Sequence, residues 1–99
     1  MQYVATGQIA HVSERTSFNK RGEEQITVVV TQSNELIPKR LEYLQFEFMG
    51  ELMDKVEDLG FRNGDLVQVT FQICGRCFAK EGLPEKYFQN LQGLSISYL

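Results

Sequence analysis

Alternation of apolar and polar side chains is the strongest pattern in this chain. From Glu24 to Gln32 apolar residues occupy every second position, which predicts a β-strand with one buried face. The same period predicts strands over Leu41 to Met49 and from about Val67 to Ile73. Leu41 and Tyr43 are out of phase with the apolar residues that follow them, so we expect a bulge or a late start in that strand.

The first and last strands are less regular. Tyr3 to Val12 has Gly7 at its centre, which predicts a strand that bends or bulges at the glycine. The polar segment from Ser13 to Gly22 is expected to be a turn or an extended loop, and Ala79 to Lys86 a charged loop. A final strand is predicted from about Tyr87 to Tyr98. Two sets of apolar residues compete for its buried face, with Phe88, Leu94 and Ile96 in one set and Leu91 in the other.

One segment has helical periodicity. Between Gly50 and Leu59 apolar residues recur at helical spacing with acidic residues between them, which predicts a short helix that ends at Gly60. The acidic residues lack the spacing of a metal-binding loop and are expected to form a solvated face. They are Glu51, Asp54, Glu57 and Asp58.

The predicted order of elements is three strands, a helix and two strands. This is the order of the OB-fold (oligonucleotide/oligosaccharide-binding fold), a partly open barrel. We therefore predict an all-β, five-stranded OB-fold barrel with one short helix between strands three and four, formed by residues 1–99 as a single domain. A five-stranded sandwich is the alternative. In the OB-fold, the face of strands two and three and the loops joining strands one and two and strands four and five are the usual ligand surface.

Composition and charge narrow the class of protein. Hydrophobic residues make up 42% and charged residues 23% of the chain, as in soluble globular proteins. The apolar runs are too short to span a membrane, and Met1 to Val4 lacks the design of a signal peptide. We therefore expect a cytoplasmic protein with reduced thiols and no membrane partner. The net charge of −3 weighs against a protein that grips duplex DNA through bulk positive charge.

Several short motifs resemble those of the bacterial single-stranded DNA-binding proteins. They are Asn19-Lys20-Arg21-Gly22-Glu23, Phe46-Glu47-Phe48-Met49-Gly50, Asn63-Gly64-Asp65-Leu66-Val67-Gln68-Val69, Gly75-Arg76-Cys77-Phe78 and Tyr87-Phe88-Gln89-Asn90-Leu91. The chain is still more similar to a family of short uncharacterised bacterial proteins of the same fold, in which a Pro-Lys pair, here Pro38-Lys39, precedes the third strand. The resemblance covers nearly the whole chain. What it implies is the OB-fold, since a fold alone does not fix a function.

Basic and aromatic residues in the predicted loops are the candidate binding residues. The basic residues of the first loop and those beside the third strand would give a positive track for a phosphate backbone, although such residues also serve as ordinary solubilising groups. Exposed rings would stack on bases at ~1–3 kcal/mol per base. The ring of Phe18 is expected either to stack on a base or to plug the barrel mouth. The nucleic-acid-binding candidates are Arg15, Phe18, Lys20, Arg21, Lys39, Arg40, Tyr43, Arg76 and Phe78.

The two cysteines have the spacing of a redox or zinc motif, but their setting opposes both. Cys74 and Cys77 fall at the end of a predicted strand, where residues three apart point to opposite faces, so a disulfide between them would need a bulge at Gly75. His11 is the single histidine, which leaves too few ligands for a structural zinc and no nucleophile with its base. We expect no metal, no cofactor and no enzymatic activity.

Two functions follow from these observations. The first is a single-stranded nucleic-acid-binding protein, for DNA or RNA without sequence preference. The alternative is a protein-interaction or assembly module, in which strand edges or the same aromatic residues form a subunit interface; the isoelectric point of about 5.1 and the absence of tryptophan favour it. A third interpretation is a small-ligand or saccharide site in the barrel mouth. The first two are compatible with a homo-oligomer, either a dimer or a tetramer.

Overall fold

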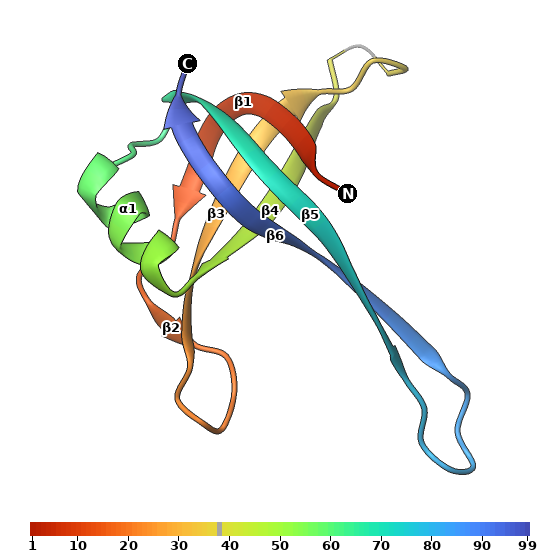
Figure 1. Cartoon of the computed structure of the whole chain (residues 1–99). Helices are drawn as coiled ribbons and strands as arrows, with labels where there is room; N and C mark the ends of the chain where they lie inside the picture. Colours follow the sequence, from red (N-terminus) through yellow and green to blue (C-terminus); the bar gives the residue numbers. More distant parts are fainter. Residues whose placement is uncertain (38) are drawn as a thin grey trace.

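The computed structural model describes residues 1–37 and 39–99, and the strands among them close into a barrel (Figure 1). The elements are β1 (Tyr3–Val12), β2 (Thr16–Ser17), β3 (Glu24–Ser33), β4 (Leu41–Met49), α1 (Glu51–Leu59), β5 (Leu66–Phe78) and β6 (Lys86–Tyr98). The strand order is β1-β5-β6-β4-β3-β2, and β1 also pairs with β3. This second pairing closes the sheet, which confirms the OB-fold barrel and excludes the sandwich. The short β2 lies in the segment expected to be a loop.

Strand β1 belongs to both sides of the barrel. Its residues Tyr3 to Gln8 pair with β5, and from Gln8 onward it pairs with β3. The register with β3 skips Ala10, so the irregularity lies there, and of the bend or bulge expected at Gly7 the bulge is absent. Gly7 has another role, because a Cβ atom on it would lie 2.2 Å from the carbonyl oxygen of Thr31. The absent side chain allows β1 to cross closely over β3.

The barrel core consists of the alternating residues that the sequence predicts to be buried. The largest fully buried side chains are Phe46, Phe48, Ile26, Val28, Val30, Val67 and Val69. The register between β3 and β4 is continuous from Leu41 to Met49, so the bulge or late start expected there is wrong. Leu41 and Tyr43 share the outer face of β4 with Gln45 and are 52% and 65% exposed. They are out of phase with the core because they point to solvent.

A bulge in β6 explains why the buried face of this strand is ambiguous in the sequence. Ser95 pairs with Thr70 whereas Gly93 pairs with Phe71, so the intervening Leu94 forms a bulge that reverses the inward phase. At Gly93 the chain passes so close to the buried Phe48 that a Cβ atom would lie 2.3 Å from its ring. The missing side chain lets β6 fit between β5 and β4. It pairs in parallel with β4 and antiparallel with β5.

The helix α1 contributes to the same core. It ends at Gly60, whose backbone is left-handed at φ 60°. Met53 and Val56 are buried and join the cluster formed by the strands. Among residues 1–37 and 39–99 no helix is long and apolar enough to cross a membrane.

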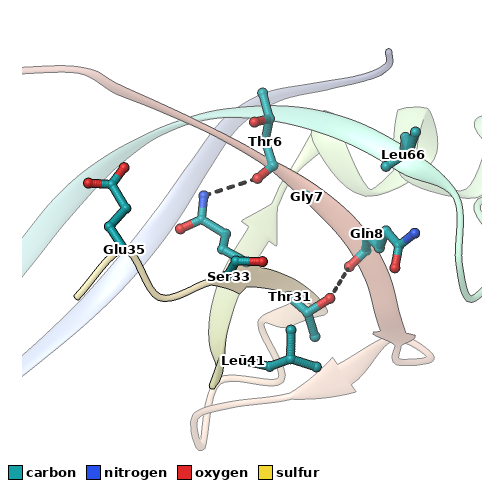
Figure 2. Close-up of a pocket in the computed structure, with 9 residues that line it drawn as sticks. Thr6, Gly7, Gln8, Thr31, Ser33, Glu35, Leu41 and Leu66 are labelled. Carbon is teal, nitrogen blue, oxygen red and sulfur yellow. Dashed lines mark hydrogen bonds between the residues drawn. The ribbon is translucent and has the colours of Figure 1, made fainter. Parts of the chain in front are cut away.

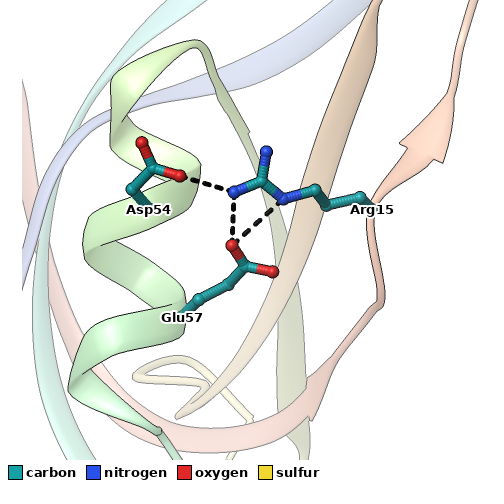
Figure 3. A network of polar contacts seen from close by, with 3 residues as sticks. All are labelled: Arg15, Asp54 and Glu57. Atoms are coloured by element: carbon teal, nitrogen blue, oxygen red, sulfur yellow. Dashed lines mark hydrogen bonds and ion pairs between the residues drawn. The ribbon is translucent and has the colours of Figure 1, made fainter.

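The guanidinium of Arg15 ties the segment after β1 to this helix (Figure 3). It donates hydrogen bonds to the carboxylates of Glu57 and Asp54, with an N–O distance of 2.6 Å to Asp54. The Arg15 hydrogen bond lowers the pKa of Glu57 below its ordinary value, and the two carboxylates raise the pKa of Arg15. The sequence predicts that the four acidic residues of the helix form a solvated face. Two of them, Asp54 and Glu57, bind Arg15 as well.

The contact between Gly93 and Phe48 gives a stability prediction. Replacing Gly93 with alanine should lower the free energy of unfolding by about 1–3 kcal/mol, because the new methyl group overlaps a ring that is itself fully buried. Gly75→Ala is the matched control, since a Cβ atom there would meet, among the described residues, only the Phe88 carbonyl oxygen at 3.9 Å. Urea unfolding of both variants measures the difference. Equal stabilities would contradict the close approach at Gly93.

The Arg15 network gives a pH prediction. Because the pKa of Glu57 is lower in the folded chain than its ordinary value near 4.5, this carboxylate stabilises the fold above that pH. The contribution disappears as pH falls through the lowered value. The stability difference between the wild-type protein and an Arg15→Met variant should be constant near neutral pH and shrink below about pH 4.5. Chemical unfolding across pH measures it, and a difference that grows on acidification would contradict the network.

Candidate nucleic-acid interface

The predicted binding residues lie at three separate places rather than along one track. The first is the turn between β2 and β3, residues 18–23. The second is formed by residues 34–37 and 39–40 with the adjoining Tyr43. The third is the hairpin formed by the ends of β5 and β6. Figure 1 shows these three places projecting from different corners of the barrel. The first two lie at opposite ends of the β3–β4 ribbon. One strand of nucleic acid therefore cannot contact all the basic loops by following a single short groove.

The β2–β3 turn is ordered by Asn19. Its side-chain oxygen accepts the backbone N–H groups of Arg21 and Glu23 at 3.0 and 3.2 Å. Lys20 is exposed, and the guanidinium of Arg21 lies 4.0 Å from the Glu23 carboxylate. Phe18 is 43% exposed and does not belong to the core cluster, which favours the stacking interpretation of this ring over a plug. Arg15, predicted to act with this turn, is already engaged by the helix.

Residues 34–37, which follow β3, are folded around Asn34. The Asn34 side-chain oxygen accepts the backbone N–H groups of Leu36 and Ile37. Arg40 lies 3.2 Å from the carboxylate of Glu42, so its charge is partly compensated. Lys39 is exposed. Pro38, the first member of the Pro-Lys pair, lies outside the described residues.

The third place is a two-stranded arm, residues 73–91, which extends the β5–β6 ribbon beyond the barrel (Figure 1). Paired residues share a face of such a ribbon, and alternate residues point to opposite faces. The outer arm face, which continues the outside of the barrel, consists of Cys74, Arg76, Phe78, Lys86, Phe88 and Asn90. The inner arm face, which continues the inward phase of β5, consists of Ile73, Gly75, Cys77, Tyr87, Gln89 and Leu91.

The outer arm face carries two rings and two cations in a checkerboard. Arg76 pairs with Phe88, and Phe78 pairs with Lys86, so each ring has a cation directly across the ribbon. Phe78 and Phe88 are 59% and 55% exposed. Arg76 and both rings, together with Cys77, line an open hollow of about 360 Å³. Aromatic faces beside positive charge are the combination that holds single strands.

Two residues of this checkerboard, Lys86 and Phe88, were not among the candidates. Phe88 was assigned to a competing core phase and Lys86 to a loop. The signal that identifies them is the hairpin register: once Arg76 and Phe78 are aligned with the strand that returns after the turn, the same two-residue spacing of cation and ring appears at Lys86 and Phe88.

The arm also differs from the other two places in the pairing of its arginine. Within the described part of the chain, Arg15, Arg21 and Arg40 each lie within 4.0 Å of a carboxylate, whereas Arg76 forms no ion pair. Among the same described residues, the lysines of the three places, Lys20, Lys39 and Lys86, form no ion pair either. The cations of the arm can therefore meet a phosphate without first leaving a partner.

The base of the arm is connected to the outer face of β4. The Asn90 side chain donates to the Glu47 carboxylate at 2.9 Å, and Gln72 donates to Gln92 at 2.7 Å. Tyr43 lies on the same face of β4 as Glu47. A polar surface with an exposed ring thus continues from the arm onto the barrel.

A second hollow, of about 510 Å³, opens where β1 leaves β3 (Figure 2). Thr31 donates to the carbonyl of Gln8 at 3.3 Å, and Gln32 donates to the carbonyl of Thr6 at 3.0 Å. Its lining includes, among the described residues, the carboxylate of Glu35 but no lysine or arginine. This site is unsuited to phosphate, and its polar lining fits the small-ligand interpretation better than the nucleic-acid one.

The cysteines take the orientation expected from strand geometry. Gly75 pairs with Gln89 in regular register, so no bulge turns Cys74 toward Cys77, and both thiols are free. The Cys74 thiol donates to the Gln92 side-chain oxygen at 3.4 Å. In residues 1–37 and 39–99 there is no cluster of three or more His, Cys, Asp or Glu side chains that could hold a metal ion.

Comparison with solved structures finds the same fold in two single-stranded DNA-binding proteins. The chain is similar to the mitochondrial single-stranded DNA-binding protein Rim1 of S. cerevisiae, with 15% identity and a TM-score of 0.69 over 100% of this chain and 94% of that one. It is also similar to the SSB of Plasmodium falciparum solved in complex with ssDNA, with 12% identity and a TM-score of 0.65 over 99% of this chain and 93% of that one. At such identities the likeness shows the fold alone.

Sequence comparison gives a family without a function. No curated protein matches the chain. A family model described as a domain of unknown function, DUF3127, matches residues 5–97, and because that match spans nearly the whole chain, the protein belongs to the DUF3127 family.

Proposed function

We propose that this protein binds single-stranded nucleic acid, DNA or RNA, without sequence preference, and that the outer arm face makes the main contact. The observation that carries the proposal is the checkerboard of Arg76, Phe78, Lys86 and Phe88 on one face of an exposed ribbon. The fold it shares with single-stranded DNA-binding proteins supports the proposal.

The checkerboard suits a strand whose bases are unpaired. Every base has a face that can stack on Phe78 or Phe88, so stacking requires no particular sequence. Arg76 and Lys86 lie across the ribbon from those rings, where they can meet the phosphates between stacked bases. The arm thus provides stacking and charge within the same few residues.

The barrel surface extends this contact. A strand leaving the arm at Asn90 meets the outer face of β4, where the exposed ring of Tyr43 gives a further stacking position. Lys39 and Arg40 lie beyond Tyr43 in the preceding loop. Phe18, Lys20 and Arg21 form a separate region that a longer strand would reach.

Stacking should contribute more to this binding than charge. The chain carries a net charge of −3, and the carboxylates of Glu23 and Glu42 lie beside Arg21 and Arg40. Few phosphates are therefore neutralised, and the dependence on salt should be shallower than for a basic binding protein. The proposed activity is binding without catalysis.

The first prediction of the proposal concerns the two rings. A Phe78→Ala/Phe88→Ala variant should bind a labelled mixed-sequence single strand at least about 30-fold more weakly than the wild-type protein, because it removes two stacking rings that each contribute about 1–3 kcal/mol. Fluorescence anisotropy at low salt measures the affinity. Leu83→Ala is the matched control, since Leu83 is an exposed apolar residue of the same arm outside the checkerboard. Equal affinities for the double variant and the control would refute the proposed site.

The second prediction identifies the cations that meet phosphate. In an Arg76→Gln/Lys86→Gln variant, the slope of log affinity against log salt should become shallower by about 0.7 for each phosphate that is no longer neutralised. A Lys20→Gln/Arg21→Gln variant removes two charges from the β2–β3 turn and should change the slope less. Anisotropy titrations at several salt concentrations give both slopes. A larger change of slope in the Lys20→Gln/Arg21→Gln variant would assign the main phosphate contact to the turn instead of the arm. Failure of the wild-type protein to bind the single strand at any salt concentration would reject the proposed function.

A further inference from the structure

We propose, on the basis of the function proposed above, that this protein prefers single-stranded RNA to single-stranded DNA. The ribose 2′-hydroxyl is recognised by a polar strip that lies between the rings of the arm and the exposed ring of Tyr43. The polar strip consists of four amide side chains and one carboxylate, which are Gln45, Gln72, Asn90, Gln92 and Glu47.

The polar strip crosses the outer surface of the barrel where three strands meet. Gln92 of β6 pairs with Glu47 of β4 on one side and with Gln72 of β5 on the other. Alternate residues of a strand share a face, so Asn90 and Gln45 extend the strip along β6 and β4. A nucleic-acid strand that passes from the arm to the exposed ring on β4 therefore crosses these side chains.

The polar strip contains no cation. The positive charges of the path lie before it, at Arg76 and Lys86 of the arm, and beyond it, at Lys39 and Arg40. A phosphate placed on the strip meets the carboxylate of Glu47 and no lysine or arginine of the strip that could neutralise it. Charge therefore disfavours phosphate at this position and favours the uncharged parts of a nucleotide.

Hydrogen bonds within the strip hold its side chains in place and leave acceptors for a ligand. The Asn90 side-chain nitrogen donates to the Glu47 carboxylate at 2.9 Å, and the Gln72 side-chain nitrogen donates to the Gln92 side-chain oxygen at 2.7 Å. Within the described part of the chain, no donor reaches the side-chain oxygens of Asn90 and Gln72 or the second carboxylate oxygen of Glu47. A ligand that covers these oxygens has to supply the donors itself.

The backbones of DNA and RNA differ in whether they can supply such donors. The sugar-phosphate backbone of DNA presents only acceptor oxygens, whereas each ribose of RNA adds a hydroxyl that both donates and accepts. DNA on the strip would displace water from the acceptors without replacing its hydrogen bonds, which costs free energy. A 2′-hydroxyl can donate to Asn90 or Glu47 and accept from the side-chain nitrogen of Gln92. RNA is therefore the better ligand.

The rings at both ends of the strip favour recognition of sugars over base edges. Phe88 precedes Asn90 by two residues on the same face, about 7 Å along the strand, and Tyr43 precedes Gln45 in the same way. Bases stacked on these rings are held by their faces, and the sugars that connect them lie over the strip. Because every RNA nucleotide has the same sugar, this recognition requires no particular sequence.

Three labelled oligonucleotides of one mixed sequence test the preference by fluorescence anisotropy. They are RNA, DNA with uracil in place of thymine, and 2′-O-methyl RNA, which cannot donate from its 2′ oxygen. RNA should have a dissociation constant at least about tenfold lower than DNA, equivalent to about 1.4 kcal/mol. The 2′-O-methyl RNA should bind no more tightly than DNA.

The outcomes separate the preference from the proposed function. Equal affinities for RNA and DNA, or for RNA and 2′-O-methyl RNA, would overturn recognition of the 2′-hydroxyl while single-strand binding still stands. A preference for particular bases that RNA and DNA share equally would assign the strip to base edges and would also overturn it. If none of the three oligonucleotides binds, the proposed function fails and the preference fails with it.

A Glu47→Gln variant tests the part played by the polar strip. It keeps an oxygen for Asn90 but removes the charge, so it should strengthen DNA binding and lower the ratio of RNA to DNA affinity at least about threefold, since hydrogen bonds to charged groups contribute more than those to neutral ones. Glu51→Gln is the matched control, because it makes the same charge change on an exposed residue of α1 and should leave the ratio unchanged. Equal ratios for the two variants would overturn the role of the strip.

Discussion

The close packing of the Phe48 ring against Gly93 is the contact on which the rest of the structure depends. It lets β6 lie near enough to β4 for Phe46 and Glu47 to pair with the facing residues of β6. Without that short parallel pairing, the five long strands would form an open sheet in the order β6-β5-β1-β3-β4. The direction in which β6 enters the barrel also sets the direction of the arm, because β5 and β6 remain paired along their whole length.

Most of the fold could be predicted from the sequence because its strands have one buried face. In β3 and β4 the alternation fixes both the strand and its register, since a slip of one residue would turn the core side chains to solvent. The predictions that were wrong depend on contacts between distant segments. A bend or bulge was expected at Gly7, but there is no bulge there and the glycine is needed for its close approach to Thr31. The sequence of β6 cannot show that Leu94 is the bulged residue.

The candidate site was less predictable because it depends on which loops come together. Arg15 has the sequence context of a ligand for phosphate, and only the position of α1 reveals that Asp54 and Glu57 engage it. Phe88 is a large apolar residue of the kind found in a core. Only its pairing with Arg76 in the exposed arm shows that it lies outside the barrel. Local patterns specify which residues are apolar or charged, whereas the length of the β5–β6 hairpin decides which of them face solvent.

The central position of β6 also determines when the chain can fold during its synthesis. The ribosome makes β6 after every other strand, yet β6 lies between β5 and β4 in the sheet. The hairpin of β3 and β4 can form early, because its partners are close in sequence. The barrel must stay open until β6 has left the exit tunnel, and strand edges exposed during that interval can pair with other chains. A nascent chain of this architecture should therefore benefit from a chaperone until its last strand is in place.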